Sequence, residues 1–423
     1  MSDVSSHRAE RAGAAAGRPA AAALRRLVTA NALSSVGDGA RFAALPLLAA
    51  SVTGGDAFWI SIVAAAGRAA WLLAPVIGTL VDRMPRHRAM IGADAARCAM
   101  LAALFTLVVG GTVPVPVLLP LAFLSGVAEV FFDSAAQAIV PTLTADQDLE
   151  RTNARIMAAQ ITGTGFVGPP LGAALWACWQ PLPFLLDAAT FLASALLLSG
   201  LVARAVRARW NGDREQSRGD GGVLHGTWAG LRMLARHRVF RRLMVVVAVL
   251  GVGQQAVYAI LVVYVVNRLG LPSSAYSLML VAAALGSLAG AKTAASTAKR
   301  LGTGRSLVLS ITVSAVSYLT VALLPWWPLV ALLLAVNSAA VVLWNVCTVS
   351  LRQRLAPQDM LGRVTGGYRL AAWGAMPLGA ALGGTLAERV GLDVPWALAG
   401  VLLLVCLPLL RGVTSTPERA GDE

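Results

Sequence analysis

The chain has 423 residues, of which 57% are hydrophobic and only 13% are charged. Soluble proteins carry about a quarter charged residues, so this composition excludes a soluble globular protein and predicts an all-α integral membrane protein. The formal net charge of +14 could indicate nucleic-acid binding. The basic residues, however, lie in alternate loops between the apolar segments, so we do not predict nucleic-acid binding.

Twelve apolar segments are long enough to cross the hydrocarbon core of a bilayer, which takes roughly 20 residues per helix. We therefore predict twelve transmembrane helices. In chain order the predicted spans cover residues 27–51, 57–80, 88–111, 114–138, 155–178, 182–203, 240–266, 273–296, 305–325, 327–350, 364–387 and 394–411.

The longest hydrophilic segment, Arg204–Arg238, separates the sixth predicted span from the seventh. The hexapeptide PLGAAL stands at Pro170–Leu175, in span 5, and again at Pro377–Leu382, in span 11. Because these positions correspond, we interpret the chain as two parallel six-helix repeats around a central site. The predicted domains are a cytoplasmic N-terminal tail (1–26), an N-terminal half (27–203), a cytoplasmic linker with an interfacial helix (204–239), a C-terminal half (240–411) and a cytoplasmic C-terminal tail (412–423).

Arginine residues occur in alternate loops, after spans 2, 4, 6, 8 and 10, and ahead of span 1. By the positive-inside rule this alternation places both termini in the cytoplasm and predicts an even number of spans. The expected partner of the chain is therefore the lipid bilayer and not a nucleic acid. Lysine occurs only at positions 292 and 299, and such Arg-rich, Ala-rich and Gly-rich usage is typical of a G+C-rich bacterial gene, which indicates a bacterial inner (plasma) membrane.

The four cysteines and four histidines show no spacing that is typical of a metal site. We therefore expect free thiols, no metal ion and no cofactor. All four histidines lie outside the predicted spans, which argues against a buried histidine proton relay.

The loop after span 2 reads Gly78-Thr-Leu-Val-Asp82-Arg83-Met-Pro-Arg86. It resembles the signature loop of the major facilitator superfamily, with a Pro where the family usually has its second Gly. The resemblance implies a conformational switch in which Gly78 lets span 2 approach span 11 closely. It also implies that Asp82 faces the positive end of a helix in the other half, and that Arg83 pairs with Asp133 of span 4.

Span 5 contains Gly165, Gly168, Pro169 and Gly172 within the stretch GTGFVGPPLGAA. This stretch is similar to the Gly- and Pro-rich antiporter motif of exporters in the same superfamily. The alternative interpretation is structural, because small residues at this density allow close helix packing and adjacent prolines bend a helix.

Further stretches narrow the resemblance, among them SSVGDGARFAALPLLA in span 1, FLLDAATFLASALLL in span 6 and RQRLAPQDMLGRV before span 11. Over nearly its whole length the chain resembles the third drug:proton antiporter group, which includes macrolide efflux and siderophore export proteins. The resemblance implies a monomeric carrier that exports a small amphiphilic molecule by alternating access as protons enter.

Six ionisable residues of the N-terminal half lie at membrane depth, where a charge is costly and is therefore a candidate for function. They are Asp38, Arg41, Arg68, Asp94, Arg97 and Glu129. The i,i+3 spacing predicts that Asp38 pairs with Arg41 and that Asp94 pairs with Arg97. In this superfamily spans 1 and 4 line the central cavity, so the resemblance favours Asp38 and Glu129 as the proton carriers. The alternative is a static network of ion pairs, which we favour for Asp94 and Arg97. We attribute Asp187 of span 6 to the N-terminal dipole of its helix.

The C-terminal half has no carboxylate away from the ends of its predicted spans. Its amide and aromatic side chains would form a neutral wall suited to an amphiphilic substrate, although each could equally serve as a contact between helices. The candidates are Gln254, Gln255, Tyr258, Asn337, Trp344, Asn345 and Trp373.

Two alternatives remain beside proton antiport. A facilitator or importer of the same fold would require no titrating carboxylate. An intramembrane phosphotransferase is suggested by the Asp38–Arg41 stretch, which resembles the start of a CDP-alcohol phosphotransferase motif, but Arg86 stands where the second metal-binding Asp of that motif belongs. We therefore predict a transporter and not an enzyme.

Overall fold

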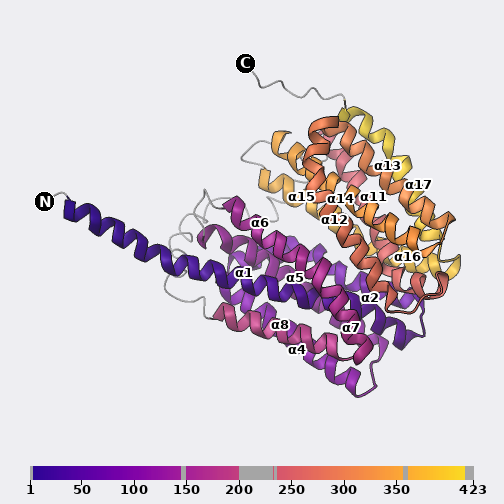
Figure 1. Cartoon of the computed structure of the whole chain (residues 1–423), viewed down its shortest axis with the longest axis horizontal. Helices are drawn as coiled ribbons and strands as arrows, with labels where there is room; N and C mark the ends of the chain where they lie inside the picture. Colours follow the sequence, from indigo (N-terminus) through magenta and orange to yellow (C-terminus); the bar gives the residue numbers. More distant parts are fainter. Residues whose placement is uncertain (1–2, 144–148, 200–231, 233–235, 356–360, 415–423) are drawn as a thin grey trace. The chain divides into compact units, whose positions relative to one another are not determined.

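The computed structural model describes residues 3–143, 149–199, 232, 236–355 and 361–414, and these residues form helices and short connections with no strand among them. Most of the predicted linker (204–239) and of the C-terminal tail (412–423) lies outside the described residues. The helices are α1 (Asp3–Thr53), α2 (Ala57–Ala69), α3 (Ala74–Asp82), α4 (Arg86–Val109), α5 (Val115–Leu143), α6 (Leu149–Gln160), α7 (Gly168–Cys178), α8 (Leu182–Ser199), α11 (Arg238–Val263), α12 (Ala275–Leu301), α13 (Thr303–Leu323), α14 (Trp327–Leu355), α15 (Leu361–Gly374), α16 (Met376–Arg389) and α17 (Val394–Thr414) (Figure 1).

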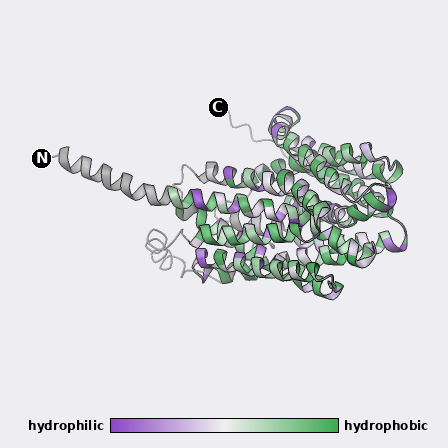
Figure 2. Cartoon of the chain, turned by 60° about the horizontal axis from the view of Figure 1, so that its bottom comes forward, coloured by the Kyte–Doolittle hydropathy of each residue, from purple (hydrophilic) through white to green (hydrophobic). Residues whose placement is uncertain are grey.

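Nine helices in the described part of the chain are long and apolar enough to cross a membrane. Figure 2 shows hydrophobic residues along most of the helical surface, as expected for helices that face lipid. The remaining three predicted spans are also helical: 27–51 lies in α1, 155–178 covers α6 and α7, and 394–411 lies in the shorter apolar helix α17. The chain is therefore an all-α, multi-pass membrane protein.

Helix α1 begins at Asp3, well ahead of the predicted first span, so the predicted N-terminal tail is largely helical. The Ala-rich run before Arg25 explains this extension, because Ala has the highest helix propensity. At its other end α1 stops at two glycines with positive φ, Gly54 and Gly55. Asp56 then caps α2 by accepting hydrogen bonds from the backbone N–H groups of Phe58 and Trp59 at 2.8 and 3.2 Å.

The chain forms two compact units. The first comprises Met1–Phe42, Ala74–Thr112 and Val127–Gly222, and the second comprises Ala43–Leu73, Val113–Gly126 and Val223–Glu423. In the first unit α4 packs along α8. In the second, α12 packs on α14, α13 on α17, and α16 on both α11 and α2. The second unit thus contains α2, which the sequence assigns to the N-terminal half.

Both copies of the PLGAAL repeat pack their helix backbone against a neighbouring helix. In the first unit a Cβ added to Gly172 would lie 2.6 Å from the Cα of Ala40 on α1. In the second unit a Cβ added to Gly379 would lie 2.7 Å from the Cα of Val252 on α11. The two glycines are equivalent in the repeat, and each is required by a close helix contact.

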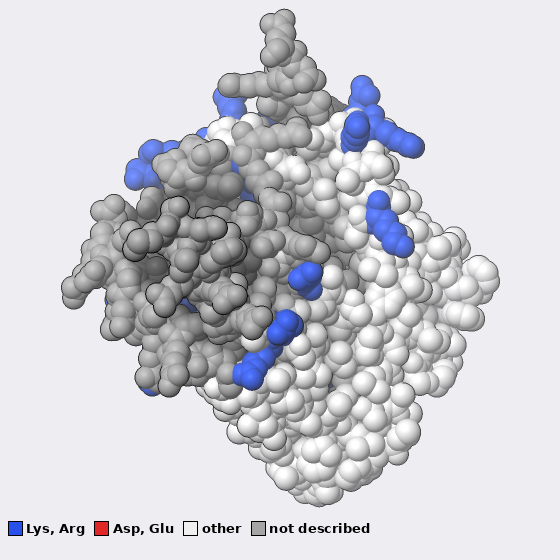
Figure 3. Space-filling model, turned by 60° about the vertical axis from the view of Figure 1, so that its left-hand side comes forward, with Lys and Arg blue, Asp and Glu red and all other residues white. Residues whose placement is uncertain are grey.

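Basic side chains are exposed near the ends of several helices. Figure 3 shows blue Lys and Arg side chains on one face, and no Asp or Glu among the described residues visible there. Exposed examples are Arg25 and Arg26 of α1, Arg83 after α3, and Lys299 and Arg300 of α12. These residues belong to the tail and loops that the sequence predicts to be cytoplasmic.

Candidate functional site

Arg41 joins two carboxylates from different helices. Its Nη2 atom donates to Asp38 Oδ1, one turn earlier on α1, at 2.6 Å, and its Nε atom donates to Asp187 Oδ2 on α8 at 2.8 Å. The side chain of Asp187 is 0% exposed, whereas those of Arg41 and Asp38 are 17% and 22% exposed. The Arg41 guanidinium is therefore the bridge between α1 and a completely buried carboxylate.

Arg97 of α4 continues the same network. Its Nη2 atom lies 3.0 Å from Asp94 Oδ1, and its Nη1 atom lies 3.8 Å from Asp38 Oδ2. The side chain of Arg97 is 3% exposed and that of Asp94 is 0% exposed. The guanidinium carbon also lies 4.9 and 4.2 Å from the ring centres of Phe132 and Phe191, which stabilises a cation away from water.

Helix α8 contributes to the network together with α1 and α4, and it does so with the residues of one face. Asp187, Thr190, Phe191 and Ser194 have the i, i+3, i+4, i+7 spacing of a single helix face, and all four are buried. Ser194 donates to Asp94 Oδ2 at 2.6 Å, and Thr190 donates to the backbone carbonyl of Asp187 at 2.8 Å. Facing them on α1 is Gly37, where an added Cβ would lie 3.1 Å from the Cα of Asp187 and would collide with the Thr190 hydroxyl.

The Ser194 hydroxyl donates a hydrogen bond to one carboxylate oxygen of Asp94, whose side chain is completely buried. We expect Ser194→Ala to lower the free energy of unfolding by about 1.5–3 kcal/mol, since a hydrogen bond to a buried charged group is lost. Thermal unfolding in detergent would measure this effect. Ser199→Ala is the matched control on the same helix, because the Ser199 hydroxyl is exposed and bonds only its own helix at 2.8 Å; equal losses in the two variants would contradict the assignment.

The two predicted i,i+3 pairs, Asp38 with Arg41 and Asp94 with Arg97, are confirmed by the structure. Asp187 lies near the beginning of its helix, as the dipole interpretation requires, but it also forms an ion pair with Arg41 that the sequence analysis did not predict. The signal for its role was the FLLDAATFLAS pattern, which places Asp187 and two hydroxyl residues on one face of an otherwise apolar helix.

The other two predicted charges lie outside this cluster. Glu129 on α5 is half-buried and makes no ion pair with another described residue, although its charge attracts Arg41 at longer range. Arg68 lies in the last turn of α2 in the second compact unit, is half-buried, and likewise forms no ion pair with a described residue. Of the three arginines in the predicted set, Arg41 and Arg97 therefore form ion pairs with described carboxylates and Arg68 does not.

The signature loop is anchored through Arg86. Its Nη1 atom donates to the backbone carbonyl of Ala138 on α5, at 2.8 Å. Asp133, on the same helix, is half-buried and takes part in a polar or electrostatic interaction. Arg83 is exposed. A Cβ added to Gly78 would meet nothing within 4 Å, and the side chain of Asp82 lies outside the described structure.

The glycine motif of span 5 packs directly behind Asp38 and Arg41. Residues Ile161–Val167 form a π-helical turn, so that the Gly168 N–H bonds the carbonyl of Gly163 five residues earlier. A Cβ on Gly163 would lie 2.6 Å from Ser35 Cβ, and one on Gly168 would lie 2.6 Å from Gly39 Cα. Together with Gly172 on Ala40, these contacts lock α7 and its preceding turn onto the segment of α1 that carries the charges.

Two details of this motif were not predicted. Gly163, which was not among the named motif residues, makes a close contact with Ser35 of α1, and the named Gly165 is half-buried. Pro169 is buried in the first turn of α7, directly after the π-helical turn, so the helix changes its geometry next to the two prolines.

The predicted substrate residues of the C-terminal half occupy different environments. Asn337 and Trp344 are buried, and they donate hydrogen bonds to Tyr318 Oη and Tyr368 Oη, both at 3.2 Å. In this conformation both residues therefore connect helices, as the structural alternative expects. Gln254, Gln255 and Tyr258 on α11 are half-buried and Asn345 is exposed. Trp373 packs edge-on against Trp71, with ring centres 4.3 Å apart.

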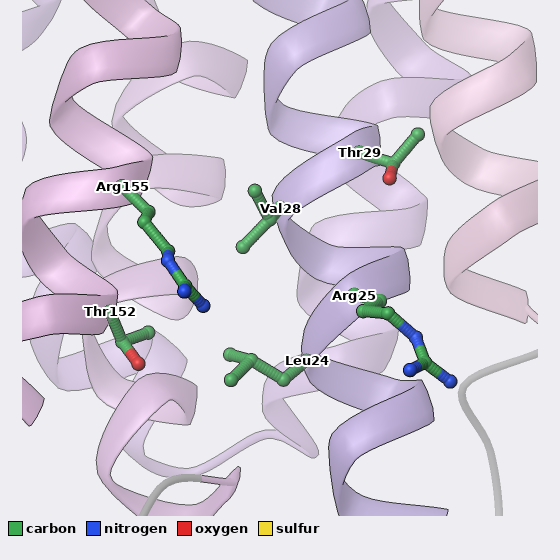
Figure 4. Close-up of a pocket in the computed structure, with 6 residues that line it drawn as sticks. All are labelled: Leu24, Arg25, Val28, Thr29, Thr152 and Arg155. Atoms are coloured by element: carbon green, nitrogen blue, oxygen red, sulfur yellow. The ribbon is translucent and has the colours of Figure 1, made fainter. Parts of the chain in front are cut away.

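A partly open hollow of about 210 Å³ lies between α1 and α6. Figure 4 shows Leu24 and Val28 pointing from α1 toward Arg155 of α6, while Arg25 points to the opposite side of α1. Thr29 and Thr152 complete the lining. None of the predicted substrate residues lies here.

The described helices form a multi-pass membrane protein with a buried cluster of charges. The profile described as Major Facilitator Superfamily matches residues 27–369 and 265–423, and the chain belongs to this superfamily. It is a transporter and not an enzyme.

The chain is similar to several transporters along most of its length. The chain is 28% identical to the multidrug efflux pump Tap of Mycolicibacterium fortuitum over 397 residues, covering 89% of this chain and 94% of the relative. It is also 28% identical to Tap of Mycobacterium tuberculosis over 411 residues, covering 94% and 96%. Among solved structures, a bacterial homologue of the iron transporter ferroportin in an inward-facing state matches with a TM-score of 0.74 at 16% identity, covering 93% of this chain and 99% of that chain. The nucleoside transporter NupG matches with a TM-score of 0.75 at 12% identity, covering 93% and 100%.

Proposed function

We propose that this protein exports a small amphiphilic molecule, such as a drug, antibiotic or natural product, by proton antiport with alternating access. The observation that carries the proposal is Asp38, a partly exposed carboxylate in α1 that is shared between two arginines. A proton-coupled carrier requires a carboxylate whose charge can change with its surroundings, and neighbouring arginines that move with the protein provide such a change.

Efflux of an amphiphilic substrate is supported by the relatives, which are named multidrug efflux pumps and match over nearly the whole chain. The half-buried amides and tyrosine of α11 offer polar contacts without a fixed charge, which suits a ligand with an apolar body. The solved structures support the fold alone, at 12–16% identity.

The proposed architecture has twelve spans in two six-helix halves, with both termini in the cytoplasm of a bacterium and the protein in its plasma membrane as a monomer. Its support is the alternation of Arg-rich loops along the sequence and the exposed basic residues at helix ends. Within this architecture the loop containing Gly78, Asp82, Arg83 and Arg86 would act as the conformational switch, and its attachment to α5 through the hydrogen bond of Arg86 to the Ala138 carbonyl supports this role.

The test is substrate-driven proton movement in everted membrane vesicles, with a panel of lipophilic cations, macrolides and siderophores. We expect at least one compound to move protons when the wild-type chain is present. Glu129→Gln should reduce this movement if Glu129 takes part in the proton path, and Asp393→Asn, in an exposed ion pair with Arg268, is the control. Transport of a panel compound that ignores the pH gradient in the wild type would contradict proton antiport.

A facilitator of the same fold is the second candidate, and one observation favours it. Every member of the cluster Asp38, Arg41, Asp94, Arg97 and Asp187 has a partner of opposite charge, as a static structural network requires. In that case Asp38→Asn would leave substrate movement and its pH dependence unchanged.

A further inference from the structure

The hollow between α1 and α6 lies within the first compact unit and contains no residue of the ion-pair network. Its described lining consists of two arginines, two threonines and two aliphatic side chains, with no carboxylate among them. Neither Arg25 nor Arg155 forms an ion pair with another described residue. The hollow is therefore a positively charged site that attracts an anion.

The hollow lies where both of its helices enter the membrane. Leu24 and Thr29 stand on either side of the beginning of the first predicted span (27–51), and Thr152 and Arg155 stand at the beginning of the fifth (155–178). Odd-numbered spans begin on the same side of the bilayer, so the two segments lie at one level. At this level the neighbouring anions are the phosphates of the lipid headgroups.

The close packing of the two segments ends before the hollow begins. Gly163, in the π-helical turn that follows α6, packs on Ser35 of α1, where an added Cβ would lie 2.6 Å from Ser35 Cβ. About two turns earlier on each helix stand Arg155 and Val28. The space between α1 and α6 thus opens where larger side chains take the place of glycine.

The polar side of the hollow comes from one face of α6, on which Thr152 and Arg155 have i, i+3 spacing. Figure 4 shows Arg155 pointing toward Leu24 and Val28 of α1. The side chain of Thr152 is 3% exposed and lines the same space. A guanidinium group binds phosphate through two parallel N–H···O bonds, and a threonine hydroxyl donates a third.

The size of the hollow and its apolar side distinguish among anions. A volume of about 210 Å³ is smaller than the roughly 300–1,000 Å³ of pockets that enclose drug-sized ligands. A phosphate with a small polar group fits this size better. Leu24 and Val28 gain nothing from a free inorganic anion, whereas they would cover the glycerol and the first methylene groups of a lipid.

We propose that this hollow binds the headgroup phosphate of an anionic phospholipid. Arg155 and Thr152 bind the phosphate, and Leu24 and Val28 pack against the beginning of the acyl chains. The bound lipid joins α6 to the part of α1 that precedes Asp38. This lipid site goes beyond the proposed transport and depends on neither its substrate nor its coupling ion.

The test is photolabelling of the purified full-length protein in phosphatidylcholine nanodiscs. The probe is phosphatidylglycerol with a diazirine near the beginning of one acyl chain, and mass spectrometry locates the label. We expect label on the peptides that contain Leu24 and Val28 and on those that contain Thr152 and Arg155, reaching a plateau as the mole fraction of the probe rises.

Arg155→Gln should raise the mole fraction of probe at half-maximal labelling about tenfold, because the charge-assisted bonds to phosphate are lost. Thr152→Val keeps the shape of the side chain and removes its hydroxyl, so it should raise this mole fraction by a smaller factor. It also serves as the second variant should Arg155→Gln fail to fold.

Arg25→Gln is the matched control. It removes the same charge at the same level of the membrane, but Figure 4 shows Arg25 pointing to the opposite side of α1. It should lose the general attraction of a basic surface for anionic lipid and keep the contacts in the hollow, so its shift should be clearly smaller than that of Arg155→Gln. Excess unlabelled phosphatidylglycerol should displace the probe, and inorganic phosphate should not.

Three results would overturn the inference. Equal shifts in Arg155→Gln and Arg25→Gln would show attraction to a basic surface without a site. Label confined to other helices would place the lipid elsewhere, and displacement by inorganic phosphate would make free phosphate the ligand. The labelling requires no transport, so each of these results leaves the proposed function untouched.

Discussion

Replacing Arg41 with methionine should destabilise the protein by about 3–5 kcal/mol, because removing one partner of a buried ion pair leaves an uncompensated charge. The charge in question is Asp187, which has no exposed surface and whose short contact is with Arg41. Thermal unfolding of the purified protein in detergent would measure the loss, together with the amount of protein inserted in the membrane.

A double variant separates the buried charge from the loss of packing. Arg41→Met combined with Asp187→Leu removes both partners, and replacement of a buried pair by apolar residues is often neutral or stabilising, so much of the stability should return. As a surface control, Arg268→Met breaks the exposed pair with Asp393, for which we expect at most about 1 kcal/mol. Similar losses of unfolding free energy for Arg41→Met and Arg268→Met would contradict the prediction that the buried ion pair matters more for stability than the surface pair.

The second large effect is expected at Gly172, where α7 meets α1. A Cβ at this position would lie 2.6 Å from the Cα of Ala40 and 2.8 Å from its carbonyl carbon, so the obstacle is backbone and cannot rotate away. Gly172→Leu should therefore separate the two helices, with a loss of about 1–3 kcal/mol or more. Since Ala40 stands between Gly39 and Arg41 on α1, the variant should also lose transport.

Thermal unfolding and transport in vesicles would measure both consequences. Gly92→Ala is the control in the same compact unit, because an added Cβ there meets nothing within 4 Å and alanine favours the helix. A Gly172→Leu protein that unfolds and transports like Gly92→Ala would contradict the close contact between α7 and α1.

The sequence predicts the helices well because bilayer thickness imposes a length and a composition that can be counted. Each predicted span coincides with one or more helices over its described residues, and nine helices of the described part meet the length and composition of a span. Helix α1 is longer than its predicted span. It begins at Asp3 and includes an Ala-rich run that is not hydrophobic enough to be predicted as part of a span.

In the candidate site, contacts between residues that are close in the sequence could be predicted, and contacts between distant residues could not. The pairs Asp38–Arg41 and Asp94–Arg97 are three residues apart on one helix, so helical geometry alone predicts them. The contact of Arg41 with Asp187 depends on how α8 lies against Gly37 of α1, which a single sequence does not reveal.

The glycine motif was recognised from its composition, but its contacts depend on local helix geometry. The turn before α7 is π-helical, and Gly163 packs on α1 ahead of Gly168. Likewise, the composition of the C-terminal half could not distinguish a ligand wall from helix contacts. The hydrogen bonds of Asn337 and Trp344 show that these two residues connect helices in this conformation.

The most direct test of the account is the simultaneous measurement of substrate and proton flux in liposomes containing purified wild type or Asp38→Asn, after a compound from the panel has been identified. The account predicts that protons and substrate move in opposite directions in the wild type. It predicts that Asp38→Asn, which leaves the Arg41–Asp187 and Arg97–Asp94 pairs in place, folds normally and moves no protons with substrate. Proton movement in Asp38→Asn equal to that of the wild type would contradict the central claim.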